Sequence, residues 1–137
     1  MPADAPELEV VRRFYAEAIN GRDASACNRL LTADFVHEGV QRGRERQREA
    51  VEVFLGAFDP LDHTIDAIFA SGDLVCARQT WRGHHVGNFY GVPASDRNAT
   101  FTSTAVLRVR DGLIAEAWDQ VDLFGLFGQI GMPPAAS

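Results

Sequence analysis

The sequence predicts a single α+β domain, with helices in the amino-terminal half and an antiparallel sheet after them. The 137 residues suit one domain, which we expect to span 1–137, with frayed tails at 1–5 and 132–137. Apolar residues first recur at helical spacing, and strand-like stretches separated by turn residues then follow. Because helices precede strands instead of alternating with them, this order favours α+β over a parallel α/β fold.

The first helix is predicted by an apolar stripe near the amino terminus. Leu8, Val11, Tyr15 and Ile19 recur at helical spacing. Asn20-Gly21 then provides a stop signal, so we expect the helix to end there.

A short helix, a brief strand and a longer helix complete the first half. Asp23 can cap the short helix, and residues 34–37 predict the strand. From about Arg44 to Phe58, apolar side chains form one stripe and charged side chains lie opposite, which is typical of an amphipathic helix. Asp59-Pro60 is expected to end this helix.

The second half predicts an antiparallel meander. Strand-like stretches separated by turn residues lie at 63–70, 74–85, 99–110 and 113–121. Asp122 can cap a last short helix, for which Gly131 provides the stop. The sheet is expected to bury one face under the helices.

The composition argues against several kinds of partner. The net charge of -6 and the pI near 5.1 disfavour nucleic acid, which needs a basic surface. Glutamates interrupt the run of Arg42, Arg44, Arg46 and Arg48, so we interpret it as a solvent-facing helix surface. No segment resembles a signal peptide or a membrane span, so we expect a cytoplasmic protein without a membrane partner.

Motifs for the common cofactors are absent from the sequence. There is no glycine-rich phosphate loop, dinucleotide fingerprint or nucleophile elbow around any serine. Cys27 and Cys76 lack the spacing of metal ligands or of a disulfide framework. We therefore expect neither a cofactor nor a metal.

The register of the hairpin at Asp111-Gly112 decides what lies beside Asp119. A two-residue turn would set the polar side of one strand against the apolar side of the other. A three-residue loop instead pairs Val109 with Leu113 and Ser103 with Asp119, which makes one face almost wholly apolar. The second register is therefore expected, with Asp119 on the core side.

An aspartate on an apolar face is a candidate for acid-base chemistry. Burial raises the pKa of a carboxyl group toward neutral pH, and Ser103 could hydrogen-bond Asp119 from the opposite strand. His85 could shuttle a proton, although a histidine at a strand end is often solvent-exposed. The candidate catalytic residues are thus Asp119, His85 and Ser103. Alternatively, Asp119 caps the following helix or pairs with an arginine.

One strand supplies the wall of a predicted small-molecule cavity. Gln79, Trp81 and His85 alternate onto the same face, which combines an aromatic surface with a few polar groups. His37, at a strand end, is placed at the cavity mouth, whereas His63 and His84 are expected on the surface. The candidate substrate-binding residues are Gln79, Trp81, His37, Tyr15, Phe101 and Ala105.

The order of several short motifs resembles the SnoaL-like polyketide cyclase family. These motifs are His84-His85-Val86-Gly87, Gly91-Val92-Pro93, Asp96-Arg97, Asp111-Gly112, Trp118-Asp119, Asp122, Gln129 and Gly131. The resemblance implies a cone-shaped α+β barrel of the nuclear transport factor 2-like type, in which helices close a curved antiparallel sheet around a central cavity. It also implies a homo-oligomer formed through the sheet; Trp118, Ile114 and Val106 make a homodimer plausible.

The resemblance also implies a chemistry. In the family's aldol cyclases, an aspartate at the position of Asp119 is the general acid-base that closes a ring of an aromatic polyketide ester, without metal or cofactor. Those enzymes carry a histidine and a glutamine on the preceding strand, where this chain has Ala105 and Ser103. Either Asp119 does more here or His85 substitutes.

Several functions therefore remain open at this point. The leading hypothesis is a cofactor-independent cyclase or isomerase of secondary metabolism, of the kind that antibiotic biosynthesis uses, acting on a hydrophobic polyketide-type or other polycyclic molecule. One alternative is a hydroxylation-type relative that works with a partner reductase. Another is a small-ligand-binding domain without catalysis. An epoxide hydrolase is less favoured, because it needs a second carboxylate and an arginine around one water.

Overall fold

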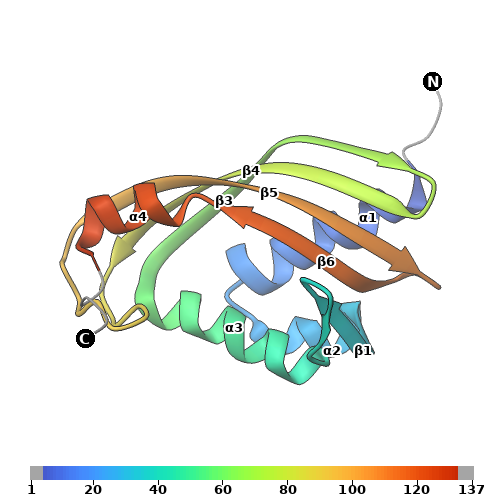
Figure 1. Cartoon of the computed structure of the whole chain (residues 1–137), viewed down its shortest axis with the longest axis horizontal. Coiled ribbons are helices and arrows are strands. Elements are labelled where there is room, and N and C mark those ends of the chain that lie inside the picture. The colour runs from blue at the N-terminus through green and yellow to red at the C-terminus, as the bar shows by residue number, and fades with distance from the viewer. Residues whose placement is uncertain (1–4, 133–137) are drawn as a thin grey trace.

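In the described residues, 5–132, six strands form one curved sheet whose concave face is covered by helices (Figure 1). The structure is a computed structural model; the expected frayed tails lie outside its described residues, except for residues 5 and 132. The helices are α1 (Pro6–Phe14), its π-helical continuation η1 (Tyr15–Asn20), the 3-10 turn η2 (Ala24–Ala26), α2 (Cys27–Leu30), α3 (Arg44–Ala57) and α4 (Leu123–Ile130). The strands are β1 (Leu31–His37), β2 (Val40–Gln41), β3 (Phe58–Ser71), β4 (Leu74–His85), β5 (Asn98–Arg110) and β6 (Leu113–Val121).

The strand order is β2-β1-β6-β5-β4-β3, and the predicted meander accounts for β3 to β6. The expectation of a wholly antiparallel sheet was wrong at one edge, where β1 runs parallel to β6. Parallel pairing needs a long connection, and α3 with four strands, β2 to β5, separates these two in the sequence. The sheet is strongly curved but open, and α1 and α3 cover its concave side (Figure 1).

The predicted helices are confirmed, and two strands begin earlier than expected. Asp23 caps the 3-10 turn by accepting from the backbone N–H of Ser25, and Asp122 caps α4 by accepting from that of Gly125. The brief strand starts at Leu31, and β3 starts at Phe58 rather than His63, because Phe58 already pairs with β4. No helix among the described residues is both long and apolar enough to cross a membrane.

The hairpin register differs from the predicted one. Asp111 and Gly112, with φ of 52° and 77°, form a two-residue turn, and a bulge in β6 then adds one residue. Beyond the bulge Asp119 pairs with Ala105, so the predicted pair with Ser103 was wrong. The extra residue corrects the alternation within the hairpin, which is why Asp119 still points inward despite the two-residue turn.

The same bulge moves Ile114 to the inner face. Ile114 pairs with Val109, is fully buried and lines the cavity described below. Its expected place on the outer sheet face was wrong. Trp118 and Val106, which pair with each other, remain half-buried on the outer face.

Candidate functional site

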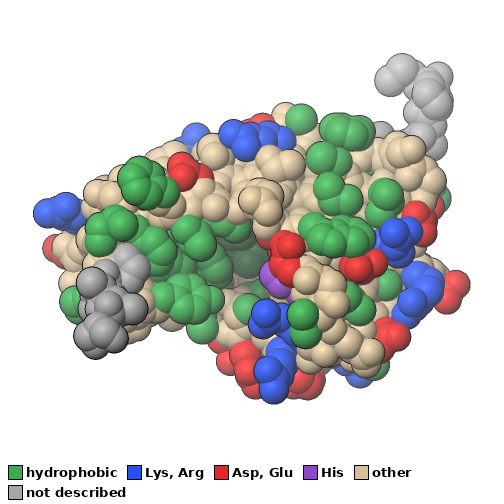
Figure 2. All heavy atoms as spheres, in the orientation of Figure 1, with side chains coloured by type: hydrophobic (Ala, Val, Ile, Leu, Met, Phe, Trp, Pro, Cys, Tyr) green, Lys and Arg blue, Asp and Glu red, His purple; other side chains and the backbone are tan. Residues whose placement is uncertain are grey.

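A cavity of about 530 Å³ lies between the concave face of the sheet and helices α1 and α3. Figure 2 shows it as a hollow lined mainly by hydrophobic side chains, with histidine and acidic side chains at one rim. This size is within the range of small-molecule sites. The lining residues are Phe14, Tyr15, Ile19, Leu31, Phe35, His37, Glu38, Arg42, Arg46, Gln47, Ala50, Val51, Phe54, Trp81, Tyr90, Phe101, Ser103, Leu107, Ile114, Ala117, Asp119, Gln120, Val121 and Leu123.

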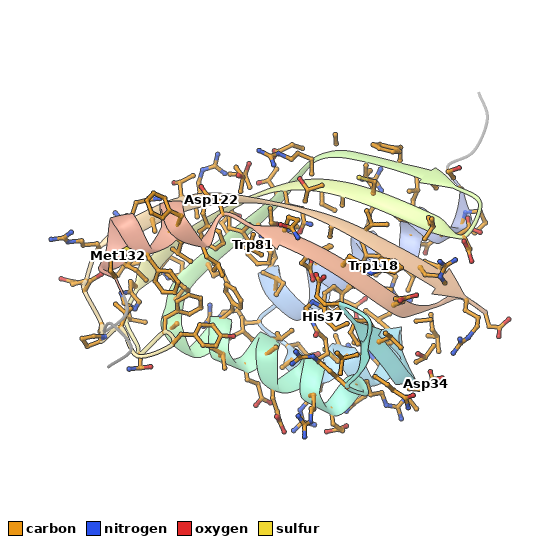
Figure 3. All side chains as sticks on the ribbon, in the orientation of Figure 1. Asp34, His37, Trp81, Trp118, Asp122 and Met132 are labelled. Atoms are coloured by element: carbon orange, nitrogen blue, oxygen red, sulfur yellow. The ribbon has the colours of Figure 1, made fainter. Side chains whose placement is uncertain are left out.

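Within this mostly apolar lining, His37 and Asp119 form a hydrogen-bonded pair. The Nε2 atom of His37 lies 2.8 Å from Oδ2 of Asp119. The two side chains are 23% and 28% exposed, so the pair is partly buried at the cavity rim. In Figure 3, His37 lies below β6, near the centre of the molecule.

The parallel pairing of β1 with β6 creates this pair. His37 is the last residue of β1 and is in register with Ala117, two residues before Asp119. Glu38 and Gly39 follow with positive φ and turn the chain into β2. The carboxylate of Glu38 accepts the backbone N–H of Asp119 at 2.6 Å. Two strands far apart in sequence are thereby fixed beside each other at the rim.

Both alternative roles predicted for Asp119 are wrong. The cap of α4 is Asp122, whose Oδ1 accepts the backbone N–H of Gly125 at 2.9 Å. The ion-pair partner of Asp119 is His37 rather than an arginine. Asp119 is therefore a cavity-facing carboxyl group, as its place on the inner face of β6 predicted.

Aromatic side chains form the deeper wall. The rings of Trp81 and Phe101 are nearly parallel, with centroids 5.8 Å apart. The indole N–H of Trp81 donates to the hydroxyl of Ser103 at 2.8 Å. Ser103 thus lines the cavity but bonds Trp81 instead of the predicted Asp119. A flat apolar ligand could stack on this wall.

Tyr15 connects the cavity to a buried polar cluster. Its ring stacks on His63, with centroids 4.3 Å apart, and His63 Nε2 lies 2.6 Å from Oε1 of Gln79. Burial raises the pKa of Tyr15 far above its usual value, the negative charge of Asp119 adds to the rise, and a hydrogen bond with Gln79 offsets part of it. The Tyr15 hydroxyl therefore stays protonated at any working pH.

The described chain matches one protein family over nearly its whole length. The model of the SnoaL-like polyketide cyclase family matches residues 9–130. The chain belongs to this family.

The chain is also similar to individual proteins and solved structures. The chain is 28% identical to the aklanonic acid methyl ester cyclase DauD of Streptomyces sp. (strain C5), over 94% of this chain and 84% of that protein. TsrD from Streptomyces laurentii has a TM-score of 0.84 and 30% identity, over 95% and 98% of the two chains. AclR from Streptomyces galilaeus, described as a candidate hydroxylase, has a TM-score of 0.84 and 26% identity, over 96% and 100%.

Among the predicted site residues of this SnoaL-like protein, His85 lies away from the cavity. It is fully buried rather than solvent-exposed, packs on Phe58 and accepts the backbone N–H of Ser95 at Nδ1. It is not among the described residues that line the cavity. Alternation along β4 predicts which face of the sheet His85 is on, but it does not predict which residues of that face line the cavity.

Gln79 and Ala105 are also buried behind the lining, on the inner face of the sheet. His63 was expected on the surface and is instead only 5% exposed, because it fills the space between Tyr15 and Trp81. His84 is partly exposed and bonds Asn98 and Asp96.

Metal ligation finds no support in these side chains. Over residues 5–132, no three or more His, Cys, Asp or Glu side chains are grouped so as to hold a metal ion. The candidate site therefore consists of the His37–Asp119 pair, Tyr15 and an aromatic wall.

Acid should weaken the folded state partly through His63. Burial lowers its pKa from the usual 6.5, so below that pH the unfolded chain binds more protons and the free energy of unfolding falls. Well above pH 6.5 the residue is neutral in both states and contributes no such dependence. Urea unfolding between pH 7 and 5 should therefore show a smaller loss in His63→Gln than in the wild type.

His84→Gln is the matched control for this effect. The pKa of His84 is raised by bonds to Asn98 and Asp96, so its contribution has the opposite sign. This variant should keep the loss of stability on acidification. An equal loss in His63→Gln and the wild type would contradict the role given to His63.

Proposed function

We propose that this protein is a cofactor-independent cyclase or isomerase that uses acid-base chemistry on a polyketide-type or other polycyclic secondary metabolite. The observation that carries the proposal is the His37–Asp119 pair inside an aromatic, mainly apolar cavity. A carboxylate held in such a site can exchange a proton with a carbon acid, while the walls hold the reacting carbons together.

Asp119 is proposed as the group that takes and returns the proton. Its Oδ2 is bonded to His37, while Oδ1 has no hydrogen bond within the described residues and is available to substrate. The carboxylate removes a proton from a carbon next to a carbonyl group. The resulting enolate carbon attacks a second carbonyl carbon, forming a carbon–carbon bond, and the new alkoxide takes the proton back from Asp119. The product is an isomer of the substrate.

His37 is proposed as a positioning residue for Asp119. By donating from Nε2 to Oδ2, it fixes the rotation of the carboxylate and leaves Oδ1 toward the cavity. The backbone N–H of Asp119, which donates to the carboxylate of Glu38, holds the same segment in place.

Tyr15 is proposed to stabilise the enolate. Its protonated hydroxyl can donate to the developing oxyanion. A donor is needed for this role, because Ala105 and Ser103 stand where the family's aldol cyclases carry a histidine and a glutamine. Tyr15→Phe should lower kcat by about 10²-fold with little change in KM. Steady-state kinetics would measure both constants.

Tyr90→Phe is the control, because Tyr90 lines the same cavity but is 59% exposed at its rim. It should leave kcat nearly unchanged. Equal effects of the two variants would argue against a specific role for the Tyr15 hydroxyl.

Product analysis with a panel of aromatic polyketide esters and the corresponding free acids tests the function directly. Ring closure by acid-base chemistry should give a product of the same mass as the substrate, without added cofactor or metal and in the presence of a chelator. Binding without turnover across the panel would instead favour a small-ligand-binding domain.

A hydroxylation-type activity is the second candidate, and the likeness to AclR favours it. That reaction inserts one oxygen atom from O₂ and consumes two electrons from a partner reductase. Its product would be one oxygen heavier and would appear only when reductase and O₂ are supplied, so the same mass measurement separates the two candidates.

A further inference from the structure

Two arginines contribute to the cavity in addition to its acidic pair. Arg42, between β2 and α3, and Arg46, in the first turn of α3, are cavity-lining residues. The sequence predicted a solvent-facing surface for this basic run, and both side chains are exposed, at the rim of the cavity. Figure 2 shows basic side chains beside the histidine at the rim of the hollow.

Neither of these two guanidinium groups has a protein partner within residues 5–132. Arg48 of the same helix pairs with Glu45 and Glu52. Other ion-paired arginines of the chain are Arg13, Arg22, Arg29, Arg82, Arg108 and Arg110. In a chain with a net charge of -6, two arginines without acidic partners at one rim form a local cationic site.

The acidic groups nearby do not neutralise this site. Asp119 is bonded to His37, and Glu38 accepts the backbone N–H of Asp119. Neither carboxylate forms an ion pair with Arg42 or Arg46 within the described residues. In the first turn of α3, Gly43 occupies the N-cap and no side chain caps the N–H groups, while the carboxylate of Glu45 in the same turn pairs with Arg48.

We propose that the substrate of this protein carries a carboxylate, which Arg42 and Arg46 bind at the cavity mouth while its ring system stacks on Trp81 and Phe101. A guanidinium group matches a carboxylate in shape and charge, whereas an ester offers only neutral acceptors. The inference rests on the proposed use of this cavity as the substrate site. It distinguishes this chain from a cyclase that acts on a methyl ester.

Binding of anthraquinone-2-carboxylate and its methyl ester, followed by quenching of tryptophan fluorescence at low ionic strength, tests the proposal. Wild type should bind the acid about tenfold more tightly than the ester, because two charge pairs that are partly exposed to solvent give only a modest gain in binding free energy. Arg42→Gln/Arg46→Gln should lose this preference while keeping its affinity for the ester. The preference for the acid should also shrink at about 0.5 M salt, because dissolved ions screen the attraction between the carboxylate and the guanidinium groups.

Arg44→Gln is the matched control, because Arg44 is on the same helix but is not among the described cavity-lining residues. It should keep the acid preference, and circular dichroism should show that every variant is folded. Equal affinities of wild type for acid and ester, or an acid preference that survives in the double variant, would overturn the inference.

Ring closure is measured separately, so the two proposals can fail independently. Turnover of esters together with equal binding of acid and ester would remove the carboxylate requirement and leave the proposed cyclase intact. An arginine-dependent acid preference without ring closure of any substrate would keep the anion site and remove the cyclase.

Discussion

Asp119→Asn should slow ring closure by about 10²–10⁴-fold while changing ligand affinity by less than about threefold. The amide keeps the size of the carboxylate but cannot accept a proton from carbon at the pH of the assay. Binding depends instead on the aromatic wall of Trp81 and Phe101, which the substitution does not touch. Ligand binding and product formation should be measured on the same samples of both proteins.

Asp122→Asn is the control for this substitution. It makes the same chemical change three residues away, in a side chain that caps α4 instead of lining the cavity, and asparagine is also a good cap. It should retain nearly full activity. Full activity in Asp119→Asn, or a loss of binding equal to its loss of rate, would refute the acid-base role of Asp119.

The position of Asp119 could be predicted from the sequence, but its partner could not. The aspartate was predicted on the inner face of β6, and it lies there because the bulge between the two-residue turn and Asp119 restores the expected alternation. His37 reaches Asp119 through a parallel pair of strands that are separated by more than half of the chain. Local periodicity carries no information about such a pairing.

The bulge itself shows why the register was mispredicted. The turn signal at Asp111-Gly112 is typical of a two-residue turn, yet that turn alone gives a mismatch of polar and apolar faces. From the alternation of apolar residues alone, a three-residue loop was the expected way to bring the two apolar faces together. The molecule instead keeps the short turn and inserts one residue, Ala115, between the pairs of Ile114 and Glu116.

Predicting which face of the sheet a side chain is on does not predict what that side chain contacts. Gln79, Trp81 and His85 were correctly placed on one face of β4, but only Trp81 lines the cavity. Gln79 and His85 are fully buried against other side chains, Gln79 against His63 and His85 against Phe58. His63 belongs to a strand whose register with β4 was not predictable, so its contact with Gln79 could not be foreseen.

The junction between α3 and β3 should be among the most sensitive points for stability. Phe58 is fully buried and follows directly on the last residue of α3. Its ring packs on Phe54, Phe89 and Phe101, with centroids 5.2–6.4 Å apart within this cluster. Gly83 lies beneath it, where an added Cβ would come within 2.9 Å of the ring. The backbone of β4 thus approaches the ring closely and leaves little room for repacking.

Phe58→Ala should lower the free energy of unfolding by about 3–5 kcal/mol, because the helix end and β4 are held apart by other contacts and cannot close the void. This is a large share of the roughly 5–15 kcal/mol that stabilises a typical domain. Phe124→Ala, at an 84% exposed position on α4, should change it by less than about 0.5 kcal/mol. Chemical denaturation of both variants makes the comparison. A loss below about 1 kcal/mol in Phe58→Ala would mean that the aromatic cluster relaxes into the space, and that the cavity it borders is more adaptable than its packing indicates.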